Sequence, residues 1–345
     1  VTGTGLSAFG HRALQYSTGI QNTAMGALAG DAITSGDFNT SLGYGSLSAT
    51  TTADMNTAIG RTALQSNTTG ANNTAVGGQA IQTNTTGANN TAVGFGALVQ
   101  NTTANNNVAV GSSSLIANTT GADNVAVGQG ALQANTTAAN NTSVGRDSLA
   151  ANTTGANNTA LGKGAAETNV DGDQNVIIGA AANTSATDGN AANVLGYSVS
   201  GAAGYTTLGN TNDDIRAAHG NVTWATVSDE RYKKDIVDSA AGLLFINALK
   251  PRTFKYKTLG ELPETFNAYE ADSTKVFKNS DTNHGFIAQE VKAAIDADSS
   301  IKDGFRLWDD REDGSQEVAE AALIPVLVKA IQEQNALIEA LTTRI

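Results

Sequence analysis

Several residue types are scarce in this chain of 345 residues, and each scarcity excludes a class of protein. Cysteine is absent, which excludes disulfides, thiolate metal sites and a cysteine nucleophile. Aromatic residues make up only 5% of the chain, and proline occurs 3 times. Hydrophobic residues reach 40% but are mostly Ala and Val, so we expect narrow layers of small side chains in place of one large core.

Basic charge and long apolar runs are scarce as well. The chain has 20 Lys and Arg against 32 Asp and Glu, a net charge of −12. Because phosphate binding needs clustered Lys and Arg, we expect neither nucleic acid nor an anionic membrane surface as the main partner. No apolar run is long enough for a membrane-spanning helix. The histidines His11, His219 and His284 are scattered, so we expect no metal and no cofactor.

What the chain does have is a 17-residue repeat over its first part. Each unit ends in an "NTAVG"-like sequence, and a fixed period over so many units is typical of a stacked repeat architecture. The glycines that close successive units are Gly26, Gly43, Gly60, Gly77, Gly94, Gly111, Gly128, Gly145, Gly162, Gly179 and Gly196.

Each unit repeats two apolar positions, one directly before the glycine (Val76) and one four residues after it (Ile81). Alternation from Asn73 to Val76 predicts a short strand, and "NTTGANN" predicts a polar turn. A unit has room for about two short strands and two turns, which is one coil of a β-solenoid. We expect the apolar pair to be buried between coils, and association of several chains to bury the Ala-rich side.

Other interpretations of the repeat are weaker. Asn67-Thr68-Thr69 and its copies match the N-glycosylation pattern, but their fixed phase favours turn formation. A disordered tract would have no reason to keep apolar residues in phase. The "N-T/V-A-V-G" core over residues 5–210 resembles the head repeats of trimeric autotransporter adhesins. That resemblance implies a parallel β-roll in a trimer, although the period here is longer than in that family.

The composition changes abruptly near residue 227. Residues 1–227 hold only 5 of the 20 basic and 11 of the 32 acidic residues, so the remainder has the charge content of a compact domain. We therefore predict a mainly β protein in three parts. Residues 1–210 form a repetitive, trimeric β-roll shaft, residues 211–227 form a linker or shaft end, and residues 228–345 form an α+β domain.

A candidate catalytic pair begins the last part. Residues 226–236 read "TVSDERYKKDI", with Ser228 five residues before Lys233. A Ser hydroxyl needs a base, and a Lys amine can serve once burial lowers its pKa enough to leave it neutral. Ser–Lys pairs are a known variant of the Ser–His–Asp arrangement, but this spacing alone is a weak signal.

Three sequence blocks make the signal specific. "SDERYKKDI" from Ser228, "HGFIAQEV" from His284 and "AALIPVLVKAIQEQNALIEAL" near the end resemble the intramolecular chaperone domain (peptidase S74) of phage tail fibres and tailspikes. The resemblance implies that the domain trimerises, guides the fibre into register and cleaves once, between Val227 and Ser228.

The same resemblance assigns roles to individual residues. Ser228 would be the nucleophile and Lys233 the general base, with the adjacent Lys234 ranked second. Asp229 and Arg231 would hold the turn and trimer contacts. In the second block, His284 is expected to be a polar anchor beside the site, with Gln289 as a further supporting residue.

The remaining pattern of this part predicts its elements. Residues 241–249 read as a short amphipathic helix, 252–257 as a strand, and 285–295 as an extended segment that becomes helical. A last helix over about 317–343 carries a coiled-coil-like apolar seam whose residues are compatible with a trimer. The seam consists of Ile324, Leu327, Ile331, Gln334, Ile338, Leu341 and Ile345.

Three functions compete at this stage. A tail fibre of a virion with a self-cleaving chaperone accounts for both parts, and it implies a homotrimer made in the host cytoplasm that binds an unidentified host receptor, glycan or protein. A bacterial trimeric surface adhesin with a retained, non-cleaving C-terminal trimerisation domain is the alternative. A glycan-cleaving spike would need paired carboxylates in a cleft, which the repeats do not offer.

Overall fold

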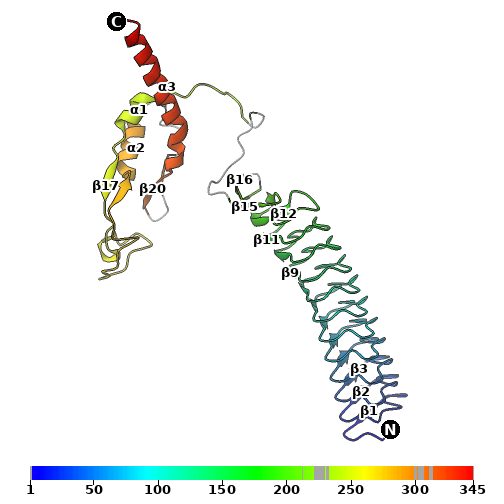
Figure 1. The fold of residues 1–345 in the computed structure, drawn as a ribbon. Helices are drawn as coiled ribbons and strands as arrows, with labels where there is room; N and C mark the ends of the chain where they lie inside the picture. The colour runs from blue at the N-terminus through cyan, green and yellow to red at the C-terminus, as the bar shows by residue number, and fades with distance from the viewer. Residues whose placement is uncertain are drawn as a thin grey trace. The chain divides into compact units, whose positions relative to one another are not determined.

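The computed structural model describes residues 2–211, 213–220, 230, 233–298, 301, 307–310 and 314–344. The chain divides into two compact units, Val1–Ser228 and Asp229–Ile345. The first unit is a β-solenoid and the second is a small α+β domain, which Figure 1 shows in colours from blue to red along the chain. The predicted fold class, a mainly β repetitive shaft followed by an α+β domain with a long last helix, is confirmed.

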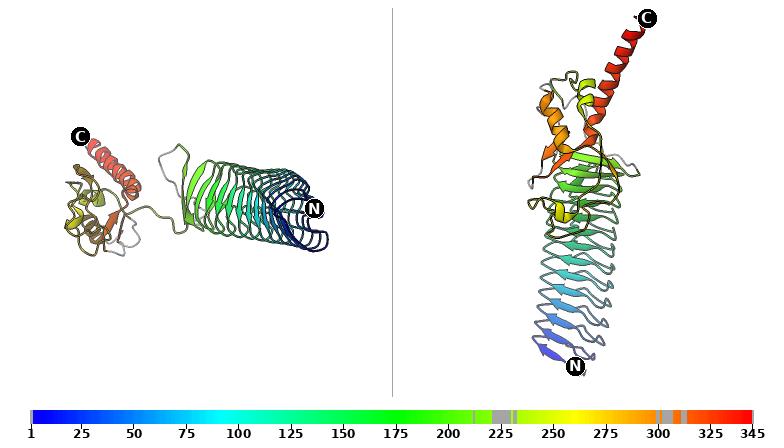
Figure 2. Two further views of the ribbon diagram at one scale, coloured as in Figure 1. Left: turned by 90° about the horizontal axis from the view of Figure 1, so that it is seen from below. Right: turned by 90° about the vertical axis from the view of Figure 1, so that its left-hand side faces the viewer.

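One long sheet organises the first unit. From β2 to β11 each coil adds a three-residue strand, and these strands pair in parallel with every residue opposite its equivalent 17 residues on, as Thr74 is opposite Thr91. The strands stack in a single ladder along the unit (Figure 2). They are β1 (Ser7–Phe9), β2 (Thr23–Met25), β3 (Thr40–Leu42), β4 (Thr57–Ile59), β5 (Thr74–Val76), β6 (Thr91–Val93), β7 (Val108–Val110), β8 (Val125–Val127), β9 (Thr142–Val144), β10 (Thr159–Leu161), β11 (Val176–Ile178), β13 (Asn193–Tyr197), β15 (Tyr205–Asn210) and β16 (Asp213–Ala218).

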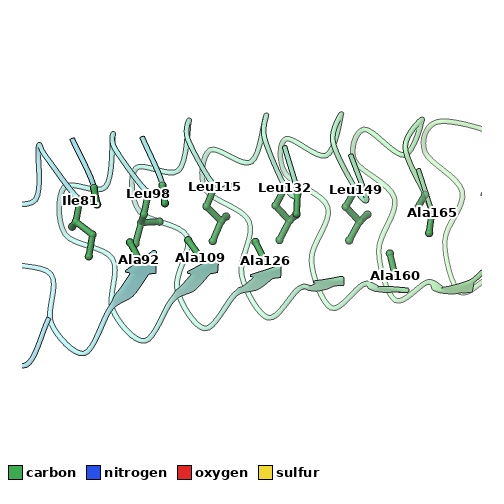
Figure 3. Packing of buried hydrophobic residues seen from close by; sticks show 14 of the residues in the cluster. Ile81, Ala92, Leu98, Ala109, Leu115, Ala126, Leu132, Leu149, Ala160 and Ala165 are labelled. Carbon is green, nitrogen blue, oxygen red and sulfur yellow. The ribbon is translucent and has the colours of Figure 1, made fainter. Parts of the chain in front are cut away.

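The core of a coil lies between the middle residue of the strand and a Leu or Ile on the opposite side. Ala92 faces Leu98 in this way, and both are fully buried (Figure 3). The expectation that the residue before the glycine is core is therefore wrong: Val93 is 38% exposed and points outward. The Ala column is likewise buried within its own chain, so the Ala-rich side is not an open surface for association.

The second predicted strand of each coil is also absent from most of the described shaft. The segment after the glycine is a run of turns in which Leu64 and Ile81 adopt φ of 50° and 49°. Only β12 (Asn183–Thr184) and β14 (Ser200–Gly201) form a short second ladder. Left-handed backbone turns a chain sharply, and this lets a 17-residue coil close around a narrow core, such as Ala92, Ala97 and Leu98.

Two columns of buried Asn side chains hold the coils together. In the first, Asn84 Nδ2 donates to Asn67 Oδ1 of the preceding coil (2.7 Å) and to Gly87 O of its own turn (2.8 Å). In the second, the backbone N–H of Asn90 donates to Asn73 Oδ1 (2.9 Å). Because these side chains are buried and hydrogen-bonded, the turn interpretation of the Asn-Thr-Thr triplets is confirmed over glycosylation.

The glycine of the repeat is required by its backbone. Gly77 has φ of 137°, and a Cβ there would lie 2.4 Å from Gly94 O of the next coil. No side chain fits such a contact, and only glycine reaches this φ without strain. At the C-terminal end, β16 pairs antiparallel with β15 and so ends the parallel ladder with a hairpin.

Among the described residues, the second unit packs three α-helices against two short two-stranded antiparallel sheets. The helices are α1 (Leu243–Ala248), α2 (Ala288–Ala297) and α3 (Leu323–Thr342), with short 3-10 turns at Leu259–Glu261 and Glu320–Ala322. β17 (Arg252–Phe254) pairs with β18 (Asn283–Gly285), and β19 (Trp308–Asp310) with β20 (Gln316–Val318). The predicted helix within 241–249 and the extended segment that becomes helical at 285–295 are confirmed, whereas the last helix begins at Leu323, later than predicted.

The core of this unit is small. It is formed by one face of each helix, with Phe245 from α1, Val291 from α2, Val326 from α3, and Leu307. Glu333 ties α3 to α1, because its Oε2 accepts the backbone N–H of Leu243 at 2.8 Å. Pro325 lies in the first turn of α3, where its missing N–H leaves no helical hydrogen bond unmade.

Candidate processing site

The predicted cleavage point lies at the junction of the two units. Val227, Ser228, Asp229 and Arg231 lie outside the described residues. Lys233 is described: its side chain is exposed, and its backbone N–H donates to Glu230 O at 2.9 Å. Lys234 is exposed as well. The roles of Ser228 and Lys233 therefore stay predictions.

The two supporting residues of the second block lie on neighbouring elements. His284 is the middle residue of β18, opposite Thr253 of β17, whose Oγ1 lies 3.4 Å from His284 Nδ1. Gln289 lies in the first turn of α2, which follows β18 after two residues. Both side chains are exposed. "HGFIAQEV" thus forms the end of a strand and the start of a helix, as its pattern predicts.

An ion pair fixes α2 against β17. Arg252 Nε donates to Glu290 Oε2 at 2.8 Å, and Arg252 Nη2 donates to Glu290 Oε1. These hydrogen bonds lower the pKa of the Glu290 carboxyl and raise the pKa of the Arg252 guanidinium. The two-point geometry is the one in which Arg holds carboxylate most specifically. It links α2, which carries Gln289, to β17, the partner strand of the β18 strand that carries His284.

His284 and Gln289 both line an open cleft of about 880 Å³. Its aromatic lining comes largely from the irregular segment after β17, including Tyr256 and Phe277, whose ring centroids lie 5.9 Å apart. The lining also includes Glu317 and Glu320. The sequence pattern did not reveal this cleft, because the segment has no periodicity. The only signal was a concentration of Phe and Tyr in an otherwise aromatic-poor chain.

Helix α3 has two apolar faces. One, with Leu323, Val326 and Ala330, is buried in the domain. The other is the predicted seam: Ile324, Leu327, Ile331, Ile338 and Leu341 are between 42% and 62% exposed. Gln334 is exposed on the same side, and Ile345 lies outside the described residues. A single copy of the domain therefore leaves a heptad-spaced apolar stripe uncovered, which we name the α3 seam.

Comparison with known proteins bears directly on this unit. Residues 228–298 match the model of the peptidase S74 family, described as the chaperone of endosialidase. The C-terminal unit carries a peptidase S74 chaperone domain. The match begins at Ser228 and includes the first two of the three sequence blocks; α3 lies beyond it. No curated protein and no solved structure matches the chain.

The chaperone domain and the solenoid together have the organisation of a tail-fibre-type protein, a repetitive shaft followed by its chaperone. In the described parts of the chain, no helix is long and apolar enough to cross a membrane. Nor does any group of three potential metal ligands occur among the described residues.

Proposed function

We propose that this chain is a segment of a virion tail fibre or spike whose chaperone domain trimerises the shaft and then cleaves itself off between Val227 and Ser228. The observation that carries the proposal is the peptidase S74 match, which begins at Ser228, together with the division of the chain into two units at the same residue. The released trimeric shaft would be displayed on the virion and would bind a host receptor, glycan or protein.

The α3 seam supports the trimer. Apolar residues spaced alternately three and four apart form the contact stripe of a coiled coil, and Ile at these positions is compatible with three strands. Five such residues are uncovered in the single domain. Because contiguous exposed apolar stripes are rare on monomers, a partner is expected to cover them.

The chemistry follows from the position of the serine directly after the scissile bond. Ser228 Oγ attacks the carbonyl carbon of Val227, the C–N bond breaks, and the acyl group moves to oxygen as an ester while the Ser228 amine is freed. Water then hydrolyses the ester, leaving the Val227 carboxylate and restoring the hydroxyl. Lys233 would take the hydroxyl proton and return it to the leaving amine.

The exposure of Lys233 in the single chain suggests when this chemistry begins. A lysine that acts as a general base needs burial of its side chain, which the exposed Lys233 does not have in the single chain. Contact with partner chains would supply it. Cleavage would then follow trimerisation and act as a final step that leaves the shaft without its chaperone.

The test is the mass of the purified full chain by denaturing mass spectrometry, in wild type, Ser228→Ala, Lys233→Ala and Lys234→Ala. We expect two fragments that split at Val227–Ser228 in wild type and Lys234→Ala, and one intact chain in the other two variants. Hydroxylamine should accelerate fragmentation by attacking the ester. A wild-type chain that stays intact while trimeric would instead identify the non-cleaving trimerisation domain of an adhesin.

A further inference from the structure

The outer face of the long sheet is uncharged along most of the shaft, and one of its two columns of side chains is apolar throughout. We define the sheet face as the first and third residues of each strand from β2 to β11. Each position forms a straight column, because the register places every residue opposite its equivalent in the next coil, as Val76 is opposite Val93. The third-position column consists of Met25, Leu42, Ile59, Val76, Val93, Val110, Val127, Val144, Leu161 and Ile178.

The strands carry their larger apolar residues on the outside. Inward positions from β2 to β10 hold only Ala or Ser, which are fully or almost fully buried. Outward positions hold Val, Ile, Leu, Met and Thr, and Leu42, Val93 and Leu161 are 41%, 38% and 48% exposed. A sheet face that is open to water normally carries polar residues, whereas the third position here is apolar in every strand from β2 to β11.

Charge is confined to the rest of the coil. None of the strands β1 to β11 contains a charged residue. The charged residues of the shaft lie in the turns, as with Arg146 and Asp147, which form an ion pair at 3.1 Å, and with the exposed Lys163 and Glu167. A surface that covers the third-position column would therefore need apolar side chains at the spacing of the coils and no compensating charge.

We infer that the sheet face is covered by the same face of further copies of this chain; the inference rests on the trimer of the proposed function. A second copy is the one surface certain to share the coil spacing, so that the columns of two parallel chains match over their whole length. Strands about 4.8 Å apart and three residues wide give a face of about 50 Å by 10 Å, or roughly 500 Å². A stable interface buries about 800 Å² on each partner, so the sheet face alone falls short and needs the chaperone domain.

The repeat leaves the register of such an interface ambiguous, and contacts of the chaperone domain would remove this ambiguity. The coils are nearly identical, so sliding one chain by a single coil along the others loses only about a tenth of the matched face. The sheet face therefore determines which side of the shaft associates but not the register. The register would be set by the α3 seam and the core of the domain, whose contacts occur once per chain.

Cysteine pairing tests the interface, because the natural chain has none. In the full chain, Val93→Cys places a thiol on the sheet face, and Thr86→Cys places one on an exposed turn of a neighbouring coil as the matched control. Under mild oxidation we expect disulfide-linked dimers in Val93→Cys and none in Thr86→Cys. Circular dichroism should show both variants folded, because both side chains point outward.

The outcomes separate this inference from the proposed function. A trimer by sedimentation that cross-links through Thr86→Cys and not through Val93→Cys overturns the sheet face while leaving the trimer intact. A monomeric chain overturns both. The double variant Ile59→Cys/Val93→Cys tests the register, since these positions lie two coils apart and trypsin separates them at Arg61. We expect 59–59 and 93–93 linked peptides only; abundant 59–93 links would show that the register is not set.

Discussion

The shaft and the chaperone domain solve the problem of a small core in opposite ways. The shaft satisfies most of its buried polar groups by repetition: an Asn typically bonds to the equivalent Asn of a neighbouring coil, as Asn101 Nδ2 does to Asn84 Oδ1 at 2.8 Å. The domain has a core of few residues and leaves a stripe of large apolar side chains exposed on α3. The shaft is therefore stabilised mainly by contacts between its own successive coils, whereas the domain leaves apolar surface available for contact with partner chains.

Substitutions on the two faces of α3 should have the largest effects, and they test whether the domain uses one face for partner contact and the other for its own stability. Ile331→Glu/Ile338→Glu places charge on the exposed α3 seam, so we expect a trimer to become a monomer while the domain stays folded. Val326→Glu places the same charge in the core, where burying an unpaired carboxylate costs several kcal/mol, and we expect the domain to unfold. Sedimentation measures the first effect and near-ultraviolet circular dichroism the second. If the seam variant remained a trimer, α3 would not be the contact.

The repeat glycine should be the most sensitive position of the shaft. In Gly128→Ala a Cβ would lie 2.5 Å from Gly145 O, at φ of 134°. A backbone conformation so unfavourable for other residues costs about 1–3 kcal/mol by itself, and the clash with the next coil adds to it. Gly204→Ala is the control: φ is 72° but no atom lies within 4 Å, so about 1–2 kcal/mol is expected. Denaturant unfolding of the two variants compares them, and equal losses would contradict the stacking contact.

The Asn column should contribute somewhat less at any one coil. Asn118→Ala removes the donor to Asn101 Oδ1 (3.2 Å) and the acceptor of Asn135 Nδ2 (2.8 Å). A buried acceptor left without a partner costs about 1–3 kcal/mol, and we expect a loss of that size in denaturant unfolding. Thr120→Ala, at an exposed side chain of the same turn, should change stability by less than about 0.5 kcal/mol. A loss of stability no larger than that of the control would mean that water satisfies the hydrogen-bonding groups that Asn118 leaves behind.

The sequence predicted the coil length but not which strand residues face the core. The 17-residue glycine period fixes the coil, because only glycine reaches its φ, and the composition change near residue 227 marks the second unit. Alternation in Asn73–Val76 defines two faces without saying which is inside. Hydrophobicity favours Val76, yet the narrow coil takes Ala75, since side-chain volume decides in a core this thin.

The second half of each coil and the cleft were beyond pattern reasoning for a different reason. Left-handed Leu64 and Ile81 have no propensity signal, because Leu and Ile rarely adopt positive φ and are held there by the stacking of coils. The cleft beside His284 is lined by an irregular segment whose shape depends on tertiary contacts. By contrast, the α3 seam could be predicted, because heptad spacing is local and was read directly from Ile324 to Leu341.

The smallest effect we predict is a pH dependence of the stability of the domain. The stability of the shaft should depend little on acid, because its Asn columns are neutral. Arg252 lowers the pKa of Glu290 below its ordinary value of 4.5, so the ionised carboxyl stabilises the folded domain above that value. This contribution is lost as the pH falls below about 4.5 and through the lowered pKa. Both side chains are partly exposed, so solvent and salt make it small. In low salt, Glu290→Gln should lower the unfolding midpoint of the domain slightly at pH 7 and by less at pH 3. Glu264→Gln, at an exposed glutamate with no ion pair to a described residue, serves as the control. A deficit of Glu290→Gln that grew toward pH 3 would reverse the sign and exclude the ion pair as its cause.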